Sequence, residues 1–155
     1  MATHREAIFL STPYREPAPA PSSEPKVEEV GTTSAPLKSI AFFLGQHCKN
    51  VNEDFILCKN EDRDPKHCLK EGRRVTRCTQ DLLAKMGQAC GKEWDAHWQC
   101  LENENHELYR CRKAERPLNK CAFDKLKLSK NIPGSPEGQP QIHEKTNPVL
   151  TGSQR

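Results

Sequence analysis

The sequence has little of the apolar material that builds an ordinary globular core. Hydrophobic residues make up 34% of the 155 residues and aromatic residues 6%, whereas an average soluble domain is roughly 45–50% apolar. The chain has room for one domain or two very small ones, and neither could bury a large interior. Something besides apolar burial must therefore help to hold the fold together.

Long hydrophobic runs and blocks of a single charge sign are also missing. The longest apolar runs are residues 7–10 and 40–44, far short of the roughly 20 residues that span a bilayer or the about 7–15 of a signal-peptide core. The 24 basic and 21 acidic residues are largely interspersed, which does not favour binding to a phosphate backbone. We therefore expect a protein that is neither transmembrane nor conventionally secreted, with no nucleic-acid partner.

Motifs of the common catalytic classes are absent as well. The sequence contains no C-x-x-C dithiol, no glycine-rich phosphate loop and no HExxH or GxSxG motif. His47 and His67 each precede a cysteine, and we interpret both as surface histidines beside bridged cysteines. Trp94 and Trp98 are interpreted as packing residues. We expect no enzymatic activity and no bound cofactor.

Proline divides the chain into a middle and two tails. Ten of the twelve prolines lie before Ala41 or after Leu128, and such stretches are typical of extended or disordered segments. Five glutamates among the first 35 residues also argue against a basic, amphipathic matrix presequence. We expect tails over residues 1–37 and 130–155, and two hairpins over residues 38–84 and 85–129.

The sequence is rich in cysteine, and the cysteines are regularly spaced. Eight of them form four C-x9-C pairs in two tandem sets, which is an internal repeat. Apolar residues at steps of three and four around the cysteines indicate amphipathic helices. The apolar side of the first expected helix consists of Ala41, Leu44, Cys48, Val51, Phe55 and Cys58.

The whole pattern predicts an all-α fold with four helices. We expect the second helix to begin at Asp64 as N-cap and Pro65 as first helical residue. A linker over residues 86–91 should separate it from a third helix that carries both tryptophans. The fourth helix should end before Pro133 and Gly134, with a kink, but no break, at Pro117. It should carry Leu108, Cys111, Ala114, Leu118 and Cys121.

Helix geometry restricts which cysteines can pair. Ten residues of helix rise about 15 Å, so the two cysteines of one C-x9-C pair cannot reach the ~7 Å Cα separation that a disulfide needs. If neighbouring helices fold back antiparallel, the two cysteines nearest the turn meet, as do the two farthest from it. Of the roughly one hundred possible pairings, this geometry selects Cys48–Cys78, Cys58–Cys68, Cys90–Cys121 and Cys100–Cys111.

Zinc binding is the alternative use of eight thiols. Zinc ligands usually have close C-x2–4-C spacing, whereas the two thiol pairs of each expected hairpin lie about 15 Å apart, too far to share a ~2.3 Å coordination sphere. A disulfide closing loops of this length contributes on the order of 3 kcal/mol in the chain-entropy model. That value is comparable to the whole net stability of a small domain. We expect disulfides to replace an apolar core, with no metal site.

The twin C-x9-C pattern resembles the coiled-coil-helix-coiled-coil-helix family of the mitochondrial intermembrane space. The resemblance covers about residues 38–128 and leaves both tails outside. It is carried by the cysteine spacing within DFILC, DPKHCLKEGRRVTRC, CGKEWDAHWQC and CRKAERPLNKC. It implies entry without a cleaved presequence, trapping by oxidative folding, and a location in the intermembrane space, peripheral on the inner membrane. It also implies transient docking of an import oxidoreductase on an apolar stripe, whose candidates are Leu44, Val51, Phe55 and Trp94.

Two twin motifs in one chain look like the double-motif accessory subunits of respiratory complex I. That resemblance implies a non-catalytic structural subunit on the intermembrane-space face of the membrane arm, with tails that run along other membrane-arm subunits. Two alternatives stay open. One is a free assembly factor or carrier of the same fold, which would separate from the mature complex in mild detergent. The other is a thiol oxidoreductase, which needs an exposed reactive thiol.

Overall fold

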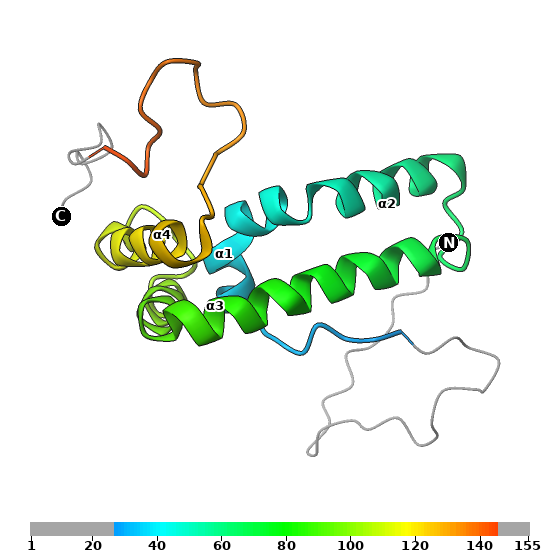
Figure 1. The fold of residues 1–155 in the computed structure, drawn as a ribbon, viewed down its shortest axis with the longest axis horizontal. Helices are drawn as coiled ribbons and strands as arrows, with labels where there is room; N and C mark the ends of the chain where they lie inside the picture. The colour runs from blue at the N-terminus through cyan, green and yellow to red at the C-terminus, as the bar shows by residue number, and fades with distance from the viewer. Residues whose placement is uncertain (1–26, 146–155) are drawn as a thin grey trace, which may run out of the picture.

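The computed structural model describes residues 27–145, and this part of the chain is all-helical (Figure 1). The helices are α1 (Ser34–His47), α2 (Lys49–Glu61), α3 (Leu69–Asn103) and α4 (Arg112–Leu126). The part of the chain that is described contains no strand, and the all-α prediction is confirmed. The outer parts of the two expected tails, residues 1–26 and 146–155, lie outside the described residues.

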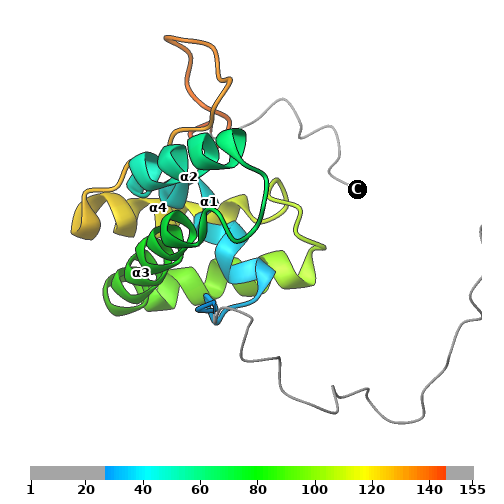
Figure 2. The same ribbon diagram turned by 90° about the vertical axis from the view of Figure 1, so that its right-hand side faces the viewer.

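The two helical hairpins share the long helix α3. Helix α2 runs beside the first half of α3, and α4 runs beside its second half (Figures 1 and 2). At Cys90 the backbone leaves helical geometry, with φ −130° and ψ 25°. This bend turns the second half of α3 across the first, so that one half is seen side-on in each view and the other end-on. The second hairpin therefore crosses the first.

The expected linker over residues 86–91 is reduced to a kink at Cys90, where two helical parts of α3 meet, and the rest of the range is helical. Gly87 and Gly91 lie in this range, and each glycine costs a helix only about 1 kcal/mol. Leu82, Met86 and Cys90 are buried on one side of the helix. Their burial, at roughly 1.5–3 kcal/mol for a large side chain, outweighs that cost.

The expected first helix is in fact two helices. Cys48, with φ −101° and ψ 18°, separates α1 from α2. The residues around it, GQHCKN, are mostly weak helix formers. The apolar side of α1 was also misplaced, since Ala41 is exposed whereas Ile40 and Phe43 are fully buried. The break lets α1 bury its own apolar side while α2 follows α3.

Two other helix starts differ from the expectation. Helix α3 begins after Cys68 rather than at Asp64 and Pro65, because the Asp64 carboxylate accepts a hydrogen bond from the Lys66 amide and forms a tight turn instead. Helix α4 begins after Cys111, so Leu108 precedes it. It then continues unbroken across Pro117, as expected, and ends where Lys127 adopts a left-handed conformation (φ 56°).

The apolar core lies where α1, α4 and the middle of α3 meet. Its buried members are Ile40, Phe43, Leu82, Met86, Cys90, Leu118, Cys121 and Ala122. Helix α2 contributes no buried residue. The expectation that disulfides replace a core therefore describes α2 of the first hairpin, whereas α4 of the second hairpin shares a core with α1 and the middle of α3.

The described parts of the flanking segments lie against the helices. Before α1, the Glu29 carbonyl accepts a hydrogen bond from Gln80 of α3 (2.9 Å). After α4, the chain forms a loop in which the Ile132 amide donates to the Gln141 side chain (2.7 Å). Of the helices in residues 27–145, none has the length and apolarity needed to cross a bilayer.

Candidate functional site

The structure contains four disulfides, each of which joins two helices or the turns next to them. Cys48 is bonded to Cys78, Cys58 to Cys68, Cys90 to Cys121 and Cys100 to Cys111. The Cα atoms of each pair lie 5.9–6.0 Å apart, within the range that disulfides require. All eight cysteines lie in the described residues, and none is free. Each hairpin thus has one disulfide beside its turn and one at its far end.

The disulfides differ in how much protein covers them. Cys90 and Cys121 are both buried and belong to the apolar core. In each of the other three, one sulfur belongs to a buried cysteine and the other to a half-buried one. Solvent access to these bonds is therefore through Cys58, Cys78 and Cys100.

The expected docking stripe is spread over three helices. Leu44 of α1, Val51 and Phe55 of α2, and Trp94 of α3 are all half-buried. The Phe55 ring lies against Gly72 of α3, where a Cβ would come within 3.5 Å of it. Trp94 packs on the core and donates a hydrogen bond to the Pro36 carbonyl (3.4 Å). In the folded chain all four side chains are partly covered, so docking on them stays a prediction about the chain before it folds.

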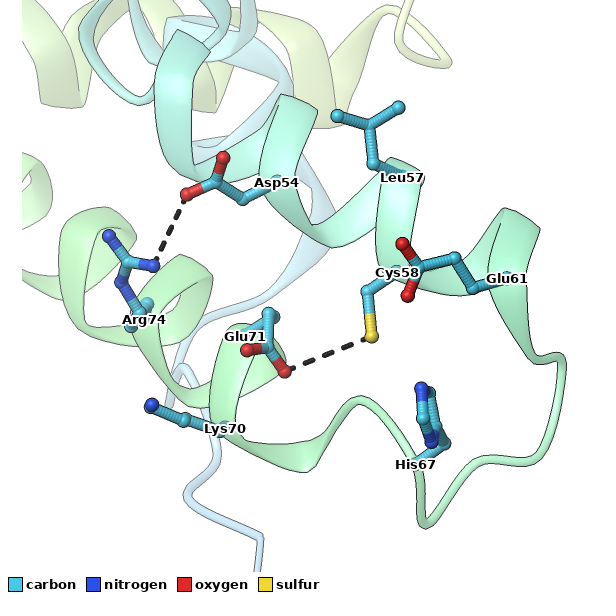
Figure 3. A pocket seen from close by; sticks show the side chains of 8 residues that line it. All are labelled: Asp54, Leu57, Cys58, Glu61, His67, Lys70, Glu71 and Arg74. Atoms are coloured by element: carbon cyan, nitrogen blue, oxygen red, sulfur yellow. Dashed lines mark hydrogen bonds and ion pairs between the residues drawn. The ribbon is translucent and has the colours of Figure 1, made fainter.

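A groove opens at the turn end of the first hairpin (Figure 3). It has a volume of about 470 Å³. Its lining residues are Asp54, Leu57, Cys58, Glu61, His67, Lys70, Glu71 and Arg74. Arg74 pairs with Asp54 across the hairpin (3.2 Å). The groove thus combines charges of both signs with the exposed Leu57 and the sulfur of Cys58, an arrangement that the sequence analysis did not anticipate.

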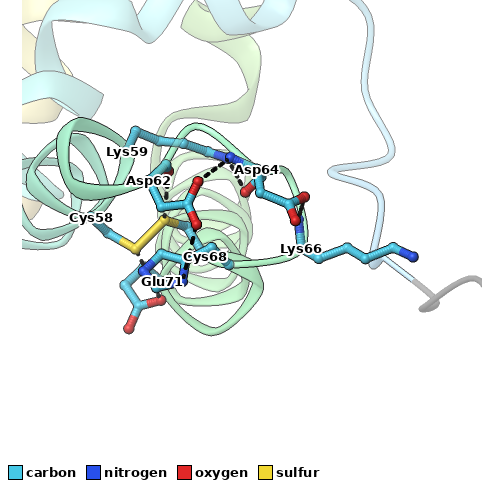
Figure 4. Close-up of polar contacts among 8 residues, drawn as sticks. Cys58, Lys59, Asp62, Asp64, Lys66, Cys68 and Glu71 are labelled. Carbon is cyan, nitrogen blue, oxygen red and sulfur yellow. Dashed lines mark hydrogen bonds and ion pairs between the residues drawn. A yellow bond between two sulfur atoms is a disulfide. The ribbon is translucent and has the colours of Figure 1, made fainter.

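The turn next to this groove is held by polar contacts (Figure 4). Lys59 donates to the Asp64 carbonyl (3.2 Å), and the Asp64 amide donates to the Asp62 carboxylate (2.8 Å). His67 is exposed and lies 3.9 Å from Asp62. The possible ligand atoms of Cys58, His67 and Cys68 lie within 4.8 Å of one another. Both sulfurs of this set share the Cys58–Cys68 bond, so the oxidised chain has no thiolate there to offer a metal.

A buried ionic cluster lies in the second hairpin. Glu115 of α4 is 1% exposed and pairs with Arg112 of the same helix and with Lys130 of the segment that follows it. The Lys130 ammonium also lies over the rings of Phe42 (5.1 Å) and Phe43 (5.8 Å) of α1. Glu115 therefore links three parts of the fold.

Burial and neighbouring charges shift the titration of this cluster. Burial alone raises the pKa of Glu115, but Lys130 and Arg112 outweigh it and hold the pKa below its ordinary value. Burial, with the positive charges of Lys130 and Arg112, lowers the pKa of His97 to about 4. The pKa of His143 is lowered by burial and by Lys130. Both histidines are thus neutral at neutral pH.

The same cluster includes a serine–histidine pair. Ser39 of α1 lies 2.7 Å from the Nδ1 atom of His97 of α3. Such a pair can activate a nucleophile, but Ser39 is 2% exposed and His97 is fully buried. The pair can therefore bind α1 to α3 but offers no route for a substrate. The two residues are 58 positions apart, and no local pattern indicated their contact.

No model of a known protein family matches the chain. The NADH-ubiquinone oxidoreductase 20.8 kDa subunit of Neurospora crassa is 48% identical over 127 residues, which cover 81% of this chain and 69% of that protein. The NADH dehydrogenase (ubiquinone) 1 alpha subcomplex subunits 8-A and 8-B of Arabidopsis thaliana are 40% and 39% identical over 88 residues, covering 57% of this chain and 82% and 83% of theirs.

Proposed function

The chain belongs to the family of respiratory complex I subunits that these relatives represent, the alpha subcomplex subunit 8 family, and we propose that it is a non-catalytic accessory subunit supporting the assembly and stability of the complex. The observation that carries the proposal is the 48% identity over 127 residues to the Neurospora subunit. Similarity of that extent goes beyond the cysteine spacing alone. The complex I membrane arm supplies the partners.

The way the structure uses its reactive groups supports a structural role. All eight cysteines are joined in disulfides, and the buried Glu115 is paired with Arg112 and Lys130. The disulfides and the Glu115–Lys130 pair each connect separate helices or segments. Groups that enzymes use for catalysis here hold the fold together, which is the expected property of a rigid clamp between other subunits.

The disulfides also support a location. Disulfides persist in oxidising compartments and are rare where thiols are kept reduced. A complex I subunit with four disulfides fits the inner membrane on its intermembrane-space face, bound peripherally. Import would use transient docking of an oxidoreductase on Leu44, Val51, Phe55 and Trp94 before folding partly covers these side chains.

Cofractionation tests the subunit proposal. When complex I is purified from mitochondria in mild detergent, we expect the chain at one copy per complex. Separation of the chain from the mature complex would contradict the proposal and favour a free assembly factor or carrier.

A substitution tests the assembly role. Serine at both Cys58 and Cys68 should lower the amount of assembled membrane arm, measured by native electrophoresis, while the electron-transfer cofactors of the remaining complex stay chemically normal. Serine at the exposed Asn60 and Lys66, in the same turn, serves as the control. Equal amounts of complex in both variants would contradict the assembly role.

A further inference from the structure

Each hairpin has a disulfide beside its turn, but the two turns differ in how exposed their residues are to solvent. Cys58–Cys68 closes a loop with a sequence separation of 10, and Cys100–Cys111 closes one of 11. In the first turn, residues 61–67 are all exposed. In the second, residues 106–108 are half-buried, Leu101 below them is fully buried, and Arg110 pairs with Glu104 and Glu107. The first turn is therefore open to solvent along its whole length, and the second is partly covered.

The open turn exposes one particular sulfur. The groove of Figure 3 is lined by Cys58, which is half-buried, whereas Cys68 is 1% exposed and does not line it. Thiol exchange requires an incoming sulfur to approach one disulfide sulfur directly. An incoming thiolate can therefore reach Cys58 from the groove, with Cys68 as the sulfur that leaves.

The two ends of the bond also differ in charge. Cys68 is the N-cap of α3, and the positive end of a helix dipole stabilises a thiolate there. Cys58 lies near the end of α2, with the Glu71 Oε2 atom 3.9 Å from its sulfur. A disulfide sulfur carries no proton, so this is a contact and no hydrogen bond. Departure of Cys68 as a thiolate is favoured, and departure of Cys58 is opposed.

We propose that the Cys58–Cys68 disulfide of the folded chain is a thiol-exchange site that opens by attack at Cys58. A dithiol is the co-reactant: one of its thiolates bonds to the Cys58 sulfur, the Cys58–Cys68 bond breaks, and Cys68 leaves as a thiolate. The second thiolate of the dithiol then attacks the other sulfur of the same dithiol, which is bonded to Cys58. That bond breaks, and Cys58 leaves as a thiolate. The dithiol loses two electrons and becomes a disulfide, and the two protein thiolates take up protons from water.

Opening this bond should leave the rest of the fold in place. Helix α2 contributes no residue to the core, and Cys48–Cys78 still joins α2 to α3 at the other end of the hairpin. The groove end of α2 can then separate from α3 and return when the bond re-forms. Exchange at this bond is compatible with a complex I subunit and with an assembly factor alike.

Limited reduction of the oxidised full-length chain tests the proposal. The chain is treated with reduced glutathione, and separately with a substoichiometric amount of dithiothreitol, then quenched by alkylation and mapped by peptide mass spectrometry. We expect Cys58 and Cys68 to be alkylated first with dithiothreitol, and glutathione to be trapped on Cys58. First opening of Cys100–Cys111, simultaneous opening of all four bonds, or glutathione trapped on Cys68 would each overturn the proposal.

Removal of a negative charge beside Cys58 gives a second test. It compares the reduction rates of variants and does not depend on which peptide is easiest to detect. Glutathione carries net negative charge, and Glu71 repels it from Cys58. The Glu71→Gln variant should therefore be reduced about two- to fivefold faster than the unchanged chain at low salt. Glu93→Gln, a half-buried glutamate farther along α3, should leave the rate unchanged. Equal rates for both variants would contradict attack at Cys58.

Discussion

The two hairpins carry the same cysteine spacing but are stabilised in different ways. Helix α2 of the first hairpin contributes no buried residue, whereas α4 of the second buries Glu115, Leu118, Cys121 and Ala122. The first hairpin therefore depends on its disulfides and a few half-buried contacts. In the second, the disulfides are added to a packed core. A cysteine repeat can therefore determine which helices pair without determining how many side chains each helix buries.

The ionic cluster adds to the same difference. Glu115, Lys130 and His97 are buried in the second hairpin, while the Arg74–Asp54 pair of the first is about half exposed. A buried charge without its partner is far more costly than an exposed one. Substitutions in the second hairpin should therefore have larger effects on stability than chemically similar substitutions in the first.

The largest expected effect is the loss of a core side chain. Phe43→Ala removes a fully buried ring from the core and should lower the free energy of unfolding by about 4 kcal/mol. Phe55→Ala removes a half-buried ring from α2 and should cost clearly less. Urea unfolding of both variants with intact disulfides, followed by circular dichroism, measures the difference. Equal losses would show that α2 is packed as tightly against α3 as α1 and α4 are packed in the shared core.

The disulfides at the far ends of the two hairpins close loops of nearly equal length, so the effects of removing each one can be compared directly. Cys48–Cys78 and Cys90–Cys121 have sequence separations of 30 and 31, so the chain-entropy model assigns each about 3.5 kcal/mol. With both members of a pair replaced by alanine, we expect fast amide hydrogen exchange throughout α2 in the first case. In the second case the core should keep α4 protected. Protection of α2 equal to that of α4 would show that the first hairpin has a sufficient core.

The sequence was informative about local features. The cysteine spacing and the apolar periodicity act within one helix, which is why four helices could be expected. Antiparallel packing of helices of equal spacing selects the same four cysteine pairs that the structure contains. Sequence patterns within single helices determine these features, so no contact between distant residues has to be known.

Features that depend on distant contacts could not be predicted. Whether a helix continues through Gly87 or breaks at Cys48 depends on what packs against it, and local propensity is a weak guide there. The Ser39–His97 contact joins residues 58 positions apart. Lys130 lies in a segment that was expected to be a tail, yet its ammonium is buried against Glu115. The groove at Cys58 likewise forms only when α2 and α3 lie side by side.

Lowering the pH should destabilise the second hairpin more than the first. The expected loss of stability is smaller than in the two comparisons above. The folded pKa of His97 is about 4 against an ordinary value of 6.5, so the unfolded chain takes up a proton first as the pH falls. The contribution of neutral His97 is fully present above about pH 6.5 and is lost as the pH falls to about 4, by about 3 kcal/mol at most. The pKa of Glu115 is lowered from its ordinary value of 4.5, so its own contribution is fully present above that pH and is lost as the pH falls below it.

Hydrogen exchange at several pH values measures this effect. Amides of α4 should lose protection between pH 6.5 and 4, while those of α2 change little. In His97→Asn, which keeps a polar group beside Ser39, the dependence in this window should shrink to the part due to His143, whose pKa is also lowered by burial. An unchanged pH dependence in that variant would contradict the assignment to His97.

The smallest expected effect concerns the exposed ion pair of the first hairpin. Arg74 and Asp54 lie 3.2 Å apart with about half of each side chain exposed, so water and salt weaken their attraction. Arg74→Ala should lower the free energy of unfolding by less than about 1 kcal/mol, and 1 M salt should remove most of that loss. Arg73→Ala, exposed on the same turn of α3, is the control. A salt-independent loss of several kcal/mol on Arg74→Ala alone would mean that the first hairpin is held by a buried ionic contact as the second is, because only a pair shielded from solvent keeps its strength at high salt.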